Sequence, residues 1–341
     1  MGDSPHLSAE YWQAAAMETV VITGITGQDG TYLAESLILD GVRVVGVVRD
    51  ADLCRTKLPE ELVEEVALVE WDMVDEYRLR NVLVENDPVA FFNLAAYSLG
   101  SGMFEDAVKM GEVNGIAVAK ILDGIRNVNP NIRFCQASSS EMFGSPDHSP
   151  QNESSAFRPR SPYGAAKLFA HTLVQTYRER YGLFACSAIL FNHESPRRKM
   201  SFVTRKVTYG VARVKLGLAT ELQLGNMEAR RDWGYAPDYV RGMMAMLAQT
   251  FPDDFVLATG ETRSVRDLCE CAFSHVGLNY RDFVKINNDD YRPEELFQLV
   301  GDASKARHSL GWAPSTKFEG MIREMVDADL RALSRSEKNE E

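Results

Sequence analysis

A strand, a glycine-rich turn and a helix follow one another near the start of this 341-residue chain, and they constrain its fold more than any other feature. The apolar run Thr19–Thr23 predicts a buried strand, and Leu33 and Leu37 mark one face of the helix that follows. Between the two lies Gly24-Ile25-Thr26-Gly27-Gln28-Asp29-Gly30. Glycines allow the backbone to turn tightly and to approach a pyrophosphate, while the helix N-terminus offers free N–H groups. The arrangement therefore predicts a dinucleotide-binding unit.

Further strand and helix patterns alternate after this unit. Strands are expected at Arg43–Val48, Val66–Glu70, Val89–Leu94, Ile132–Ala137 and Phe184–Leu190, and helices at Val108–Ile125 and Tyr163–Tyr181. Such alternation predicts an α/β fold with a doubly wound, Rossmann-type parallel sheet, whose ligand lies at the carboxyl ends of the strands. A smaller C-terminal α/β domain for the substrate is expected from a strand at Phe255–Ala258 and helices at Phe202–Leu216, Val265–Val276, Ser304–Leu310 and Phe318–Leu333.

Four residues with acid–base chemistry fall at the expected ligand edge of the sheet. Ser139 and Glu141 follow an expected strand, and Tyr163 and Lys167 begin an expected helix. Residues at i and i+4 share a helix face, so the Lys167 ammonium is expected beside the Tyr163 phenol. A free phenol titrates near pH ~10, and a neighbouring cation favours the phenolate, which can act as a base on a sugar hydroxyl. The Tyr-x-x-x-Lys pattern alone would fit a solvated helix face, but its combination with the glycine turn favours catalysis.

Charge is distributed unevenly along an acidic chain. The 37 Lys and Arg and the 49 Asp and Glu residues give a net charge of 37 − 49 = −12, which argues against broad nucleic-acid binding. Against this background stand the cations Arg205, Lys206, Arg213, Lys215, Arg230, Arg231 and Arg292. Such cations form either a solvated helix face or an anion site, and arginine forks match the geometry of a diphosphate. We expect a small anionic ligand here.

The remaining composition indicates a reducing compartment and no membrane association. The five cysteines lack the spacing of a metal site, so reduced thiols in a cytoplasmic protein are expected. No apolar run approaches the ~20 residues that a membrane helix needs. Residues 1–17 lack the features of a secretory signal and are expected to form a loose or weakly helical N-terminal arm, and residues 336–341 are expected to form a frayed tail.

Several motifs resemble the extended short-chain dehydrogenase/reductase family and, within it, the GDP-mannose 4,6-dehydratase branch. They are Ala137–Gly144, Arg158–Lys167, Leu190–Arg198, Phe202–Lys206 and Arg231–Gly234. The likeness runs from about Thr19 to Arg335. It implies an NADP-binding Rossmann domain over residues 18–190, with interleaved segments near 230–260, and a nucleotide-sugar-binding domain over most of residues 191–335. A GDP-sugar substrate and a homodimer or homotetramer are implied as well.

The resemblance implies conversion of GDP-mannose to GDP-4-keto-6-deoxymannose without net redox and without a metal. Tyr163, assisted by Lys167, would take the proton from the sugar O4 while the nicotinamide accepts a hydride from C4. Glu141 would then remove the C5 proton and protonate the departing C6 hydroxyl, after which the hydride returns to C6. Ser139, which stands where the family has a threonine, would hydrogen-bond O4.

The resemblance also implies ligand-binding roles residue by residue. The implied cofactor residues are Gly24, Thr26, Gly27, Gln28, Asp29, Gly30, Arg49, Asp72, Met73, Leu94, Ala95, Ala96, Tyr163 and Lys167. The implied sugar-nucleotide residues are Ser98, Asn192, Val203, Lys206, Leu222, Gly225, Arg231, Arg292 and Glu295. Arg49 favours NADP through its 2′-phosphate, whereas Asp50 in place of a second arginine leaves NAD open. His193 and Glu194 are interpreted as structural groups of a turn.

Three other functions fit parts of the pattern. A GDP-4-keto-6-deoxy-sugar reductase of the same family also carries the Ser-Ser-Glu, Tyr and Lys residues, and the turn His193–Arg198 is what favours the dehydratase. Another GDP-sugar, such as a GDP-heptose, is open because Tyr97–Phe104 departs from the family, with Tyr97 in place of a glutamine. An NADP-binding regulatory protein would need none of the four acid–base residues.

Overall fold

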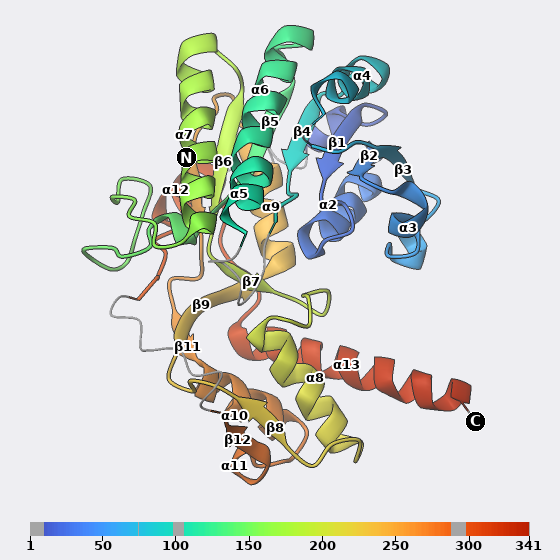
Figure 1. Ribbon diagram of the computed structural model, residues 1–341, viewed down its shortest axis with the longest axis vertical. Helices are drawn as coiled ribbons and strands as arrows, with labels where there is room; N and C mark the ends of the chain where they lie inside the picture. The colour runs from blue at the N-terminus through green and yellow to red at the C-terminus, as the bar shows by residue number, and fades with distance from the viewer. Residues whose placement is uncertain (1–9, 74, 98–105, 288–297, 341) are drawn as a thin grey trace.

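A seven-stranded parallel sheet forms the centre of the larger of two lobes (Figure 1). The structure is a computed structural model that describes residues 10–73, 75–97, 106–287 and 298–340. The strands are β1 Thr19–Thr23, β2 Arg43–Val48, β3 Val66–Glu70, β4 Ala90–Asn93, β5 Arg133–Ser139, β6 Ala185–Leu190 and β10 Phe255–Leu257. They lie in the order β10, β6, β5, β4, β1, β2, β3, and every neighbouring pair is parallel. All carboxyl ends therefore meet at one edge, as the sequence predicts.

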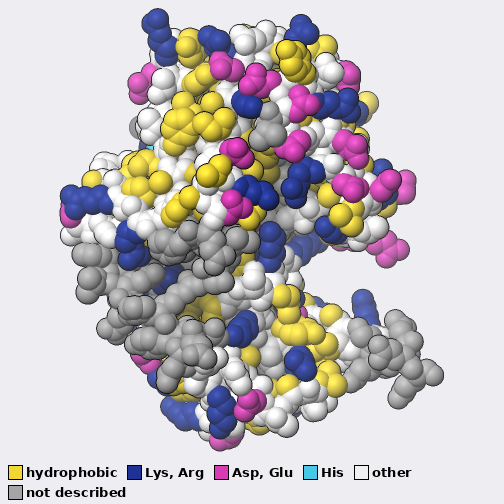
Figure 2. Space-filling view, in the orientation of Figure 1, with side chains coloured by type: hydrophobic (Ala, Val, Ile, Leu, Met, Phe, Trp, Pro, Cys, Tyr) yellow, Lys and Arg dark blue, Asp and Glu magenta, His cyan; other side chains and the backbone are white. Residues whose placement is uncertain are grey.

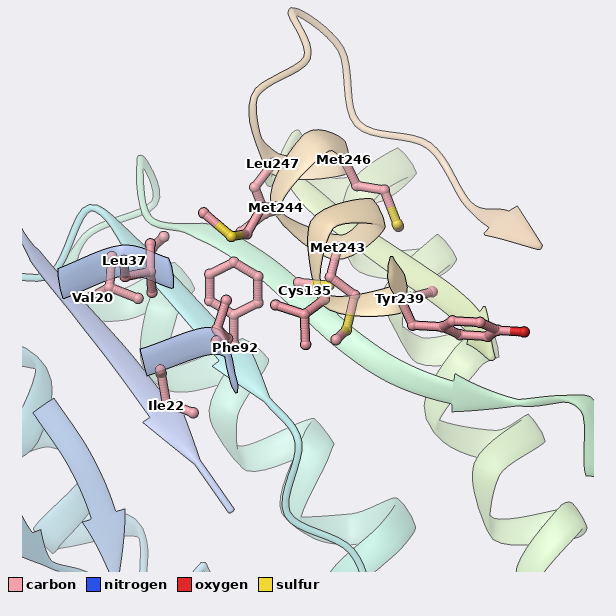
Figure 3. Packing of buried hydrophobic residues seen from close by; sticks show 14 of the residues in the cluster. Val20, Ile22, Leu37, Phe92, Cys135, Tyr239, Met243, Met244, Met246 and Leu247 are labelled. Atoms are coloured by element: carbon pink, nitrogen blue, oxygen red, sulfur yellow. The ribbon is translucent and has the colours of Figure 1, made fainter. Parts of the chain in front are cut away.

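Helices cover both faces of this sheet. α2 (Gln28–Leu39) and α9 (Ala236–Leu247) pack on one face, and α4 (Glu76–Asn86), α6 (Ala117–Val128) and α7 (Pro162–Tyr181) pack on the other. Successive strand residues point to opposite faces, so Val20 and Ile22 join the first layer and Val21 joins the second. Figure 3 shows the first layer, in which Met244 of α9 points towards Phe92 of the sheet.

The smaller lobe faces the carboxyl edge of the sheet (Figure 1). Its strands are β7 Asn192–Glu194, β8 Leu222–Leu224, β9 Arg230–Tyr235, β11 Thr262–Ser264 and β12 Val284–Ile286, which form one three-stranded and one two-stranded sheet. Its helices are α8 Val203–Lys215, α10 Val265–His275, α11 Tyr280–Phe283 and α13 Phe318–Glu340. Val207, Leu268 and Ile322 belong to a core of their own in this lobe.

The two lobes are interleaved along the chain. After β9 the chain returns to the larger lobe as α9 and β10, and the expected strand at 255–258 pairs there with β6. Helix α12 (Ser304–Leu310) returns to the same lobe before α13. The shorter elements are α3 Ala51–Arg55, α5 Ala107–Gly111, the 3-10 turns Glu60–Leu62 and Ser140–Met142, and a π-helical turn at Glu112–Ile116. The helix expected over Val108–Ile125 is thus α5, the π-helical turn and α6 in succession.

The described part of the segment before β1 is helical, one of the two forms expected for the N-terminal arm, but it is anchored in the core rather than loose. Residues 10–14 are helical, and Trp12 is fully buried. The Trp12 ring lies 6.1 Å from that of Phe92, centroid to centroid, and its indole N–H donates to the carbonyl of Met244 at 3.2 Å. One tryptophan buries enough apolar surface to fix a segment too short to show periodicity.

The C-terminal helix is longer than the sequence pattern indicates. α13 continues to Glu340 rather than ending near Leu333, so residues 336–340 are helical and not a frayed tail. The residues that extend it, such as Glu337 and Lys338, are good helix formers, so the helix continues where apolar periodicity stops. Within the part of the chain that the structure describes, no helix combines the length and the apolar character that crossing a membrane requires.

Candidate functional site

A large cleft separates the two lobes. It encloses about 1500 Å³ between the loops at the carboxyl edge of the sheet and the smaller lobe. Figure 2 shows this hollow, with Lys and Arg side chains gathered around it. A pocket for one small molecule typically holds roughly 300–1,000 Å³, so this cleft has room for two ligands side by side.

The glycine turn forms one wall of the cleft. Gly24 has φ +73°, and a Cβ atom there would lie 2.8 Å from the backbone nitrogen of Ala95. A Cβ atom on Gly30 would lie 2.3 Å from the carbonyl oxygen of Gly24. Glycine is therefore required for the turn to approach both β4 and its own helix. The N-terminus of α2 begins at Gln28 and faces the cleft with no side-chain cap from Gly27.

The cofactor residues inferred from sequence meet along this wall. The cleft-lining set contains Gly24, Thr26, Gly27, Gln28, Asp29, Gly30, Arg49, Asp72, Met73, Leu94, Ala95, Ala96, Tyr163 and Lys167. A dinucleotide fits them, because the glycines leave room for a pyrophosphate on the N-terminus of α2. The buried hydroxyl of Ser138, which sequence reasoning did not single out, also lines the cleft and has no hydrogen-bond partner within the described residues.

The end of β2 carries the residues expected to distinguish NAD from NADP. Arg49 lines the cleft, and Lys57, which was not predicted, lines it too. The Asp50 carboxylate instead accepts a hydrogen bond from the Leu53 backbone N–H at 2.8 Å and caps α3. The carboxylate is thus committed to the end of a helix.

A buried chain of hydrogen bonds runs across the strand ends and reaches Lys167, one of the four acid–base residues. The Thr23 hydroxyl donates to the Asn93 side chain at 2.6 Å, and Asn93 donates to Gln136 at 2.8 Å. The carbonyl of Ala137 then accepts from Gln136 at 3.0 Å and from the Lys167 ammonium at 2.8 Å. These bonds span β1, β4 and β5 and fix the position of Lys167 relative to the glycine turn.

Burial controls the protonation of the Tyr163–Lys167 pair. The Lys167 nitrogen lies 5.8 Å from the centroid of the Tyr163 ring, so the expected proximity is present. Desolvation, assisted by the Glu141 carboxylate, raises the pKa of Tyr163 to about 12, while a hydrogen bond with Ser139 acts in the opposite direction. Desolvation also lowers the pKa of Lys167 to about 8. The expected lowering of the tyrosine pKa is therefore wrong for the protein alone, because burial outweighs the neighbouring cation.

Ser139 and Glu141 lie beside the N-terminus of α7. The Ser139 hydroxyl accepts from the Glu141 backbone N–H at 3.2 Å and caps the 3-10 turn at the end of β5. α7 approaches this turn so closely that a Cβ atom on Gly164 would lie 2.6 Å from the Glu141 carbonyl oxygen. Both side chains line the cleft together with Tyr163 and Lys167, so the structure brings the four acid–base residues to one place.

The turn that follows β6 is fastened to α2. The Gln28 amide donates to the His193 carbonyl at 3.0 Å and accepts from the Ser195 hydroxyl at 2.7 Å. His193 lies 2.9 Å from Asp29, and Arg197 pairs with Glu35. The side chains of Gln28 and Asp29, predicted as cofactor residues, are therefore directed to this turn, which lines the cleft between the two halves.

Only half of the described residues of the expected basic cluster line the cleft. These are Lys206, Arg230 and Arg231, and Asn192, Val203 and Gly225 line it as well. Arg205 pairs with the buried Asp329 of α13. Arg213 and Lys215, at the far end of α8, donate to the backbone carbonyls of Leu218 and Val276. Adjacent helix residues point about 100° apart, so charge alone could not select the inward position. Leu222 packs against Gly210 of α8, whereas Leu224, two residues further along β8, lines the cleft.

Some predicted residues cannot be placed, and some functional candidates were missed. Ser98, Arg292, Glu295 and most of the Tyr97–Phe104 loop lie outside the described residues. Asn114, buried in the π-helical turn, accepts from the Tyr97 N–H at 2.8 Å and donates to its carbonyl at 3.0 Å. Arg198 lines the cleft, and its guanidinium lies 3.6 Å from the centroid of the Phe202 ring. Its charge acts against the rise in the pKa of Tyr163. The spacing of apolar residues in the sequence does not indicate the π-helical turn.

Comparisons with known proteins agree with this geometry. The family model described as GDP-mannose 4,6 dehydratase matches residues 21–325. GDP-mannose 4,6 dehydratase 1 of Arabidopsis thaliana is 44% identical over 327 residues, which cover 92% of this chain and 90% of that protein. The epimerase Mth375 of Methanothermobacter thermautotrophicus matches 97% of this chain and 98% of its own with a TM-score of 0.83 at 22% identity. The dTDP-glucose 4,6-dehydratase of Bacillus anthracis in complex with NAD matches 93% of this chain and 98% of its own chain, with a TM-score of 0.80 at 17% identity. At these identities the solved structures show the fold alone.

Proposed function

This chain belongs to the GDP-mannose 4,6-dehydratase family, and on that premise we propose that it is a hydro-lyase that converts GDP-mannose to GDP-4-keto-6-deoxymannose. The observation that carries the proposal is the placement of the four acid–base residues in a cleft with room for two ligands. We assign the dinucleotide to the larger lobe, residues 18–190 with the interleaved segments near 230–260. The sugar nucleotide is assigned to the smaller lobe, mostly residues 191–335.

The residues of the chain divide the proton transfers between them. A bound nicotinamide dinucleotide supplies a hydride acceptor for C4 and a donor for C6, and its positive ring charge favours a nearby phenolate. Tyr163 takes the proton of the sugar O4, and the Ser139 hydroxyl orients that oxygen. Lys167, held by the Ala137 carbonyl, supplies the cation beside the phenol. Glu141 moves the C5 proton to the C6 hydroxyl, which leaves as water.

The anionic end of the sugar nucleotide is assigned to the basic side of the cleft. Asn192, Lys206 and Arg231 hold the diphosphate in this proposal, and Leu224 and Val203 contact the base. The support is their shared position on the lining, opposite the glycine turn. Arginine and lysine beside an amide provide the donors that a diphosphate requires.

The decisive experiment supplies GDP-mannose and a catalytic amount of NADP and follows the sugar nucleotide by mass spectrometry. Loss of one water with no accumulation of reduced cofactor is expected. The Glu141→Gln variant should dehydrate the substrate about 10²–10⁴-fold more slowly, since it lacks the general acid–base group. Glu85→Gln, on the exposed face of α4, is the matched control and should keep the rate. An unchanged rate in Glu141→Gln would refute the carboxylate role, and an unchanged substrate would refute the activity.

NADP is the proposed form of the cofactor. Arg49 and Lys57 both line the dinucleotide side of the cleft, and Asp50 is committed to the cap of α3. Two cations beside a carboxylate that is committed to a helix cap suit a 2′-phosphate. NADP should therefore bind more tightly than NAD, and Arg49→Ala should reduce this preference about tenfold. Arg55→Ala, whose guanidinium donates to the Val63 carbonyl, is the control, and tighter NAD binding by the wild type would reverse the assignment.

A homodimer through α5 and α7 is proposed as the assembly. Val108 of α5 is 74% exposed and Phe169 of α7 is 45% exposed, and Ile116 and Tyr181 are exposed as well. Exposed apolar side chains on adjacent helices are typical of a subunit interface. Light scattering coupled to size exclusion should give twice the chain mass, and Phe169→Asp should give the monomer. A tetramer would show as four times the mass, and a monomeric wild type would exclude the interface.

A cytoplasmic location is proposed from the thiols. All five cysteines are free, and burial raises the pKa of Cys135, Cys186 and Cys269. Such thiols are poor nucleophiles, and a reducing environment keeps them as free thiols. Fractionation of the source cells would test the location directly.

A further inference from the structure

One face of α2 carries several groups that fasten the turn Phe191–Arg198 to the larger lobe. Gln28, Tyr32 and Glu35 stand at i, i+4 and i+7, so they share that face, and Asp29 lies beside them. Gln28 bonds the turn through its amide, Glu35 pairs with Arg197, and the same guanidinium lies 4.1 Å over the Tyr32 ring. The helix that begins at the cofactor turn is thereby joined to the segment that carries Asn192.

The hydrogen bonds of His193 define its charge. The Nδ1 atom lies 2.8 Å from the Phe191 carbonyl oxygen, and the Nε2 atom lies 2.9 Å from an Asp29 carboxylate oxygen. A carbonyl and a carboxylate only accept hydrogen bonds, whereas a neutral imidazole has a single N–H donor. Both contacts are made only when both ring nitrogens carry a proton. His193 is therefore an imidazolium paired with a carboxylate in a buried position.

The other groups around the ring hold it in this orientation. Tyr239 of α9 stacks on His193 at 4.8 Å between ring centroids. Arg198 of the same turn opposes the positive charge, and burial opposes it too, but Asp29 outweighs both and the pKa of His193 is raised. The pKa of Asp29 is lowered by His193 and Arg198 despite burial. The neighbouring Glu194 carboxylate is held by Thr204 and by Arg198, so it is not available to replace Asp29.

We propose that the His193–Asp29 pair is a positioning device that couples the binding of the dinucleotide to the binding of the nucleotide sugar, and that loss of the imidazolium proton uncouples them. The proposal rests on the proposed function, since it assigns the two ligands to the two sides of the cleft. Asp29 lies between Gly27 and Gly30, and Asn192 directly precedes His193. A ligand that orders either segment orders the other through the pair. Such coupling is reciprocal, so each ligand tightens the other by the same factor.

The sign of the pH dependence follows from the two groups. His193 has a pKa raised above its ordinary value of 6.5, so its share of the pairing is complete below that value and is lost as pH rises through the raised pKa. Asp29 has a pKa lowered below its ordinary value of 3.8, so its share is present above that value and is lost as pH falls through the lowered pKa. The pair is therefore intact between the two ordinary values, 3.8 and 6.5, and is lost as pH rises through the raised pKa of His193.

The test measures the dissociation constant of NADP with and without saturating GDP at about pH 5.5 and about pH 9, on either side of ordinary histidine titration. The ratio of the two constants at one pH cancels the titration of NADP itself. In the wild type, GDP should lower the dissociation constant of NADP about tenfold at the lower pH, and the ratio of the two constants should approach one at the higher pH. Asp29→Asn should give a small ratio at both pH values. His308→Gln, an exposed histidine outside the cleft, should behave as the wild type.

Each outcome separates the coupling from the proposed function. Absence of NADP and GDP binding would refute both. Binding of both ligands with a ratio that does not change with pH, or a pH-dependent ratio in Asp29→Asn, would overturn the pair alone. Nitrogen-15 NMR of the histidines gives an independent readout, with the His193 signals identified by their loss in His193→Gln. Two protonated ring nitrogens at pH ~6 are expected, and a neutral His193 ring at that pH would overturn the proposal.

Discussion

Replacing Lys167 by methionine should stabilise the fold while it removes the activity. Burial lowers the pKa of Lys167 to about 8 from an ordinary value of 10.5, so at neutral pH the folded protein holds a disfavoured ammonium. The difference corresponds to about 3 kcal/mol of unfolding free energy, at roughly 1.4 kcal/mol for each pKa unit. The lost hydrogen bond subtracts about 1 kcal/mol. The Ala137 carbonyl is not left unsatisfied, since Gln136 also donates to it. The expected net gain is about 2 kcal/mol at neutral pH.

The assay is urea unfolding of both proteins at about pH 7 and about pH 9.5. A lysine with a lowered pKa binds its proton less tightly in the folded state, so wild-type stability should rise with pH between about 8 and 10.5. The advantage of Lys167→Met should shrink by about 2 kcal/mol between the two conditions. The exposed Lys317→Met is the control, with a change within about 0.5 kcal/mol. A Lys167→Met protein less stable than the wild type at neutral pH would refute the reasoning.

Three further predictions follow from the cleft and the core. Gly24→Ala places a Cβ atom in a left-handed backbone at about 1–2 kcal/mol and against β4, so calorimetry should show a lower melting temperature and titration a more than tenfold weaker NADP affinity. Arg205→Ala removes the cation that pairs with Asp329 and should lower the free energy of unfolding in urea by about 3 kcal/mol without weakening GDP binding. Lys206→Ala should weaken GDP binding with a smaller change in stability. The reverse pattern would support the prediction that Arg205 belongs to the anion site. Trp12→Ala should cost about 3–5 kcal/mol and keep kcat, and a loss near zero would show that the segment is not anchored.

The sheet and its ligand edge could be predicted because buried parallel strands read as short continuous apolar runs. Thr19–Thr23 and Val66–Glu70 have the bounds that the pattern indicates. The position of the glycine turn could be predicted as well, because a strand before it and a helix after it require a tight turn at Gly24 and Gly30. Ser139 and Lys167 follow from the same logic, as a strand end and a helix start at one edge of the sheet.

The features that escaped prediction depend on what surrounds a residue rather than on its neighbours in sequence. β9, Arg230–Tyr235, is a strand with charged residues that pairs with two other short strands, so it has no apolar pattern. Arg205 and Lys206 differ only in helix phase, which sequence spacing does not fix to within one residue. The direction of the Tyr163 pKa depends on how far burial outweighs a nearby cation, and burial is a property of the folded chain.

The contact between Trp12 and Met244 joins residues 232 positions apart, and this has a consequence during synthesis on the ribosome. The strands of the dinucleotide unit leave the ribosome early, but α9, which covers one face of them, is translated much later. Until then α9 is missing from that face, and the Trp12 indole lacks the Met244 carbonyl that accepts its hydrogen bond. The nascent chain therefore exposes an apolar sheet face to chaperones for most of its translation time, and a transcript that stops before residue 236 yields a polypeptide that cellular quality control should recognise and degrade.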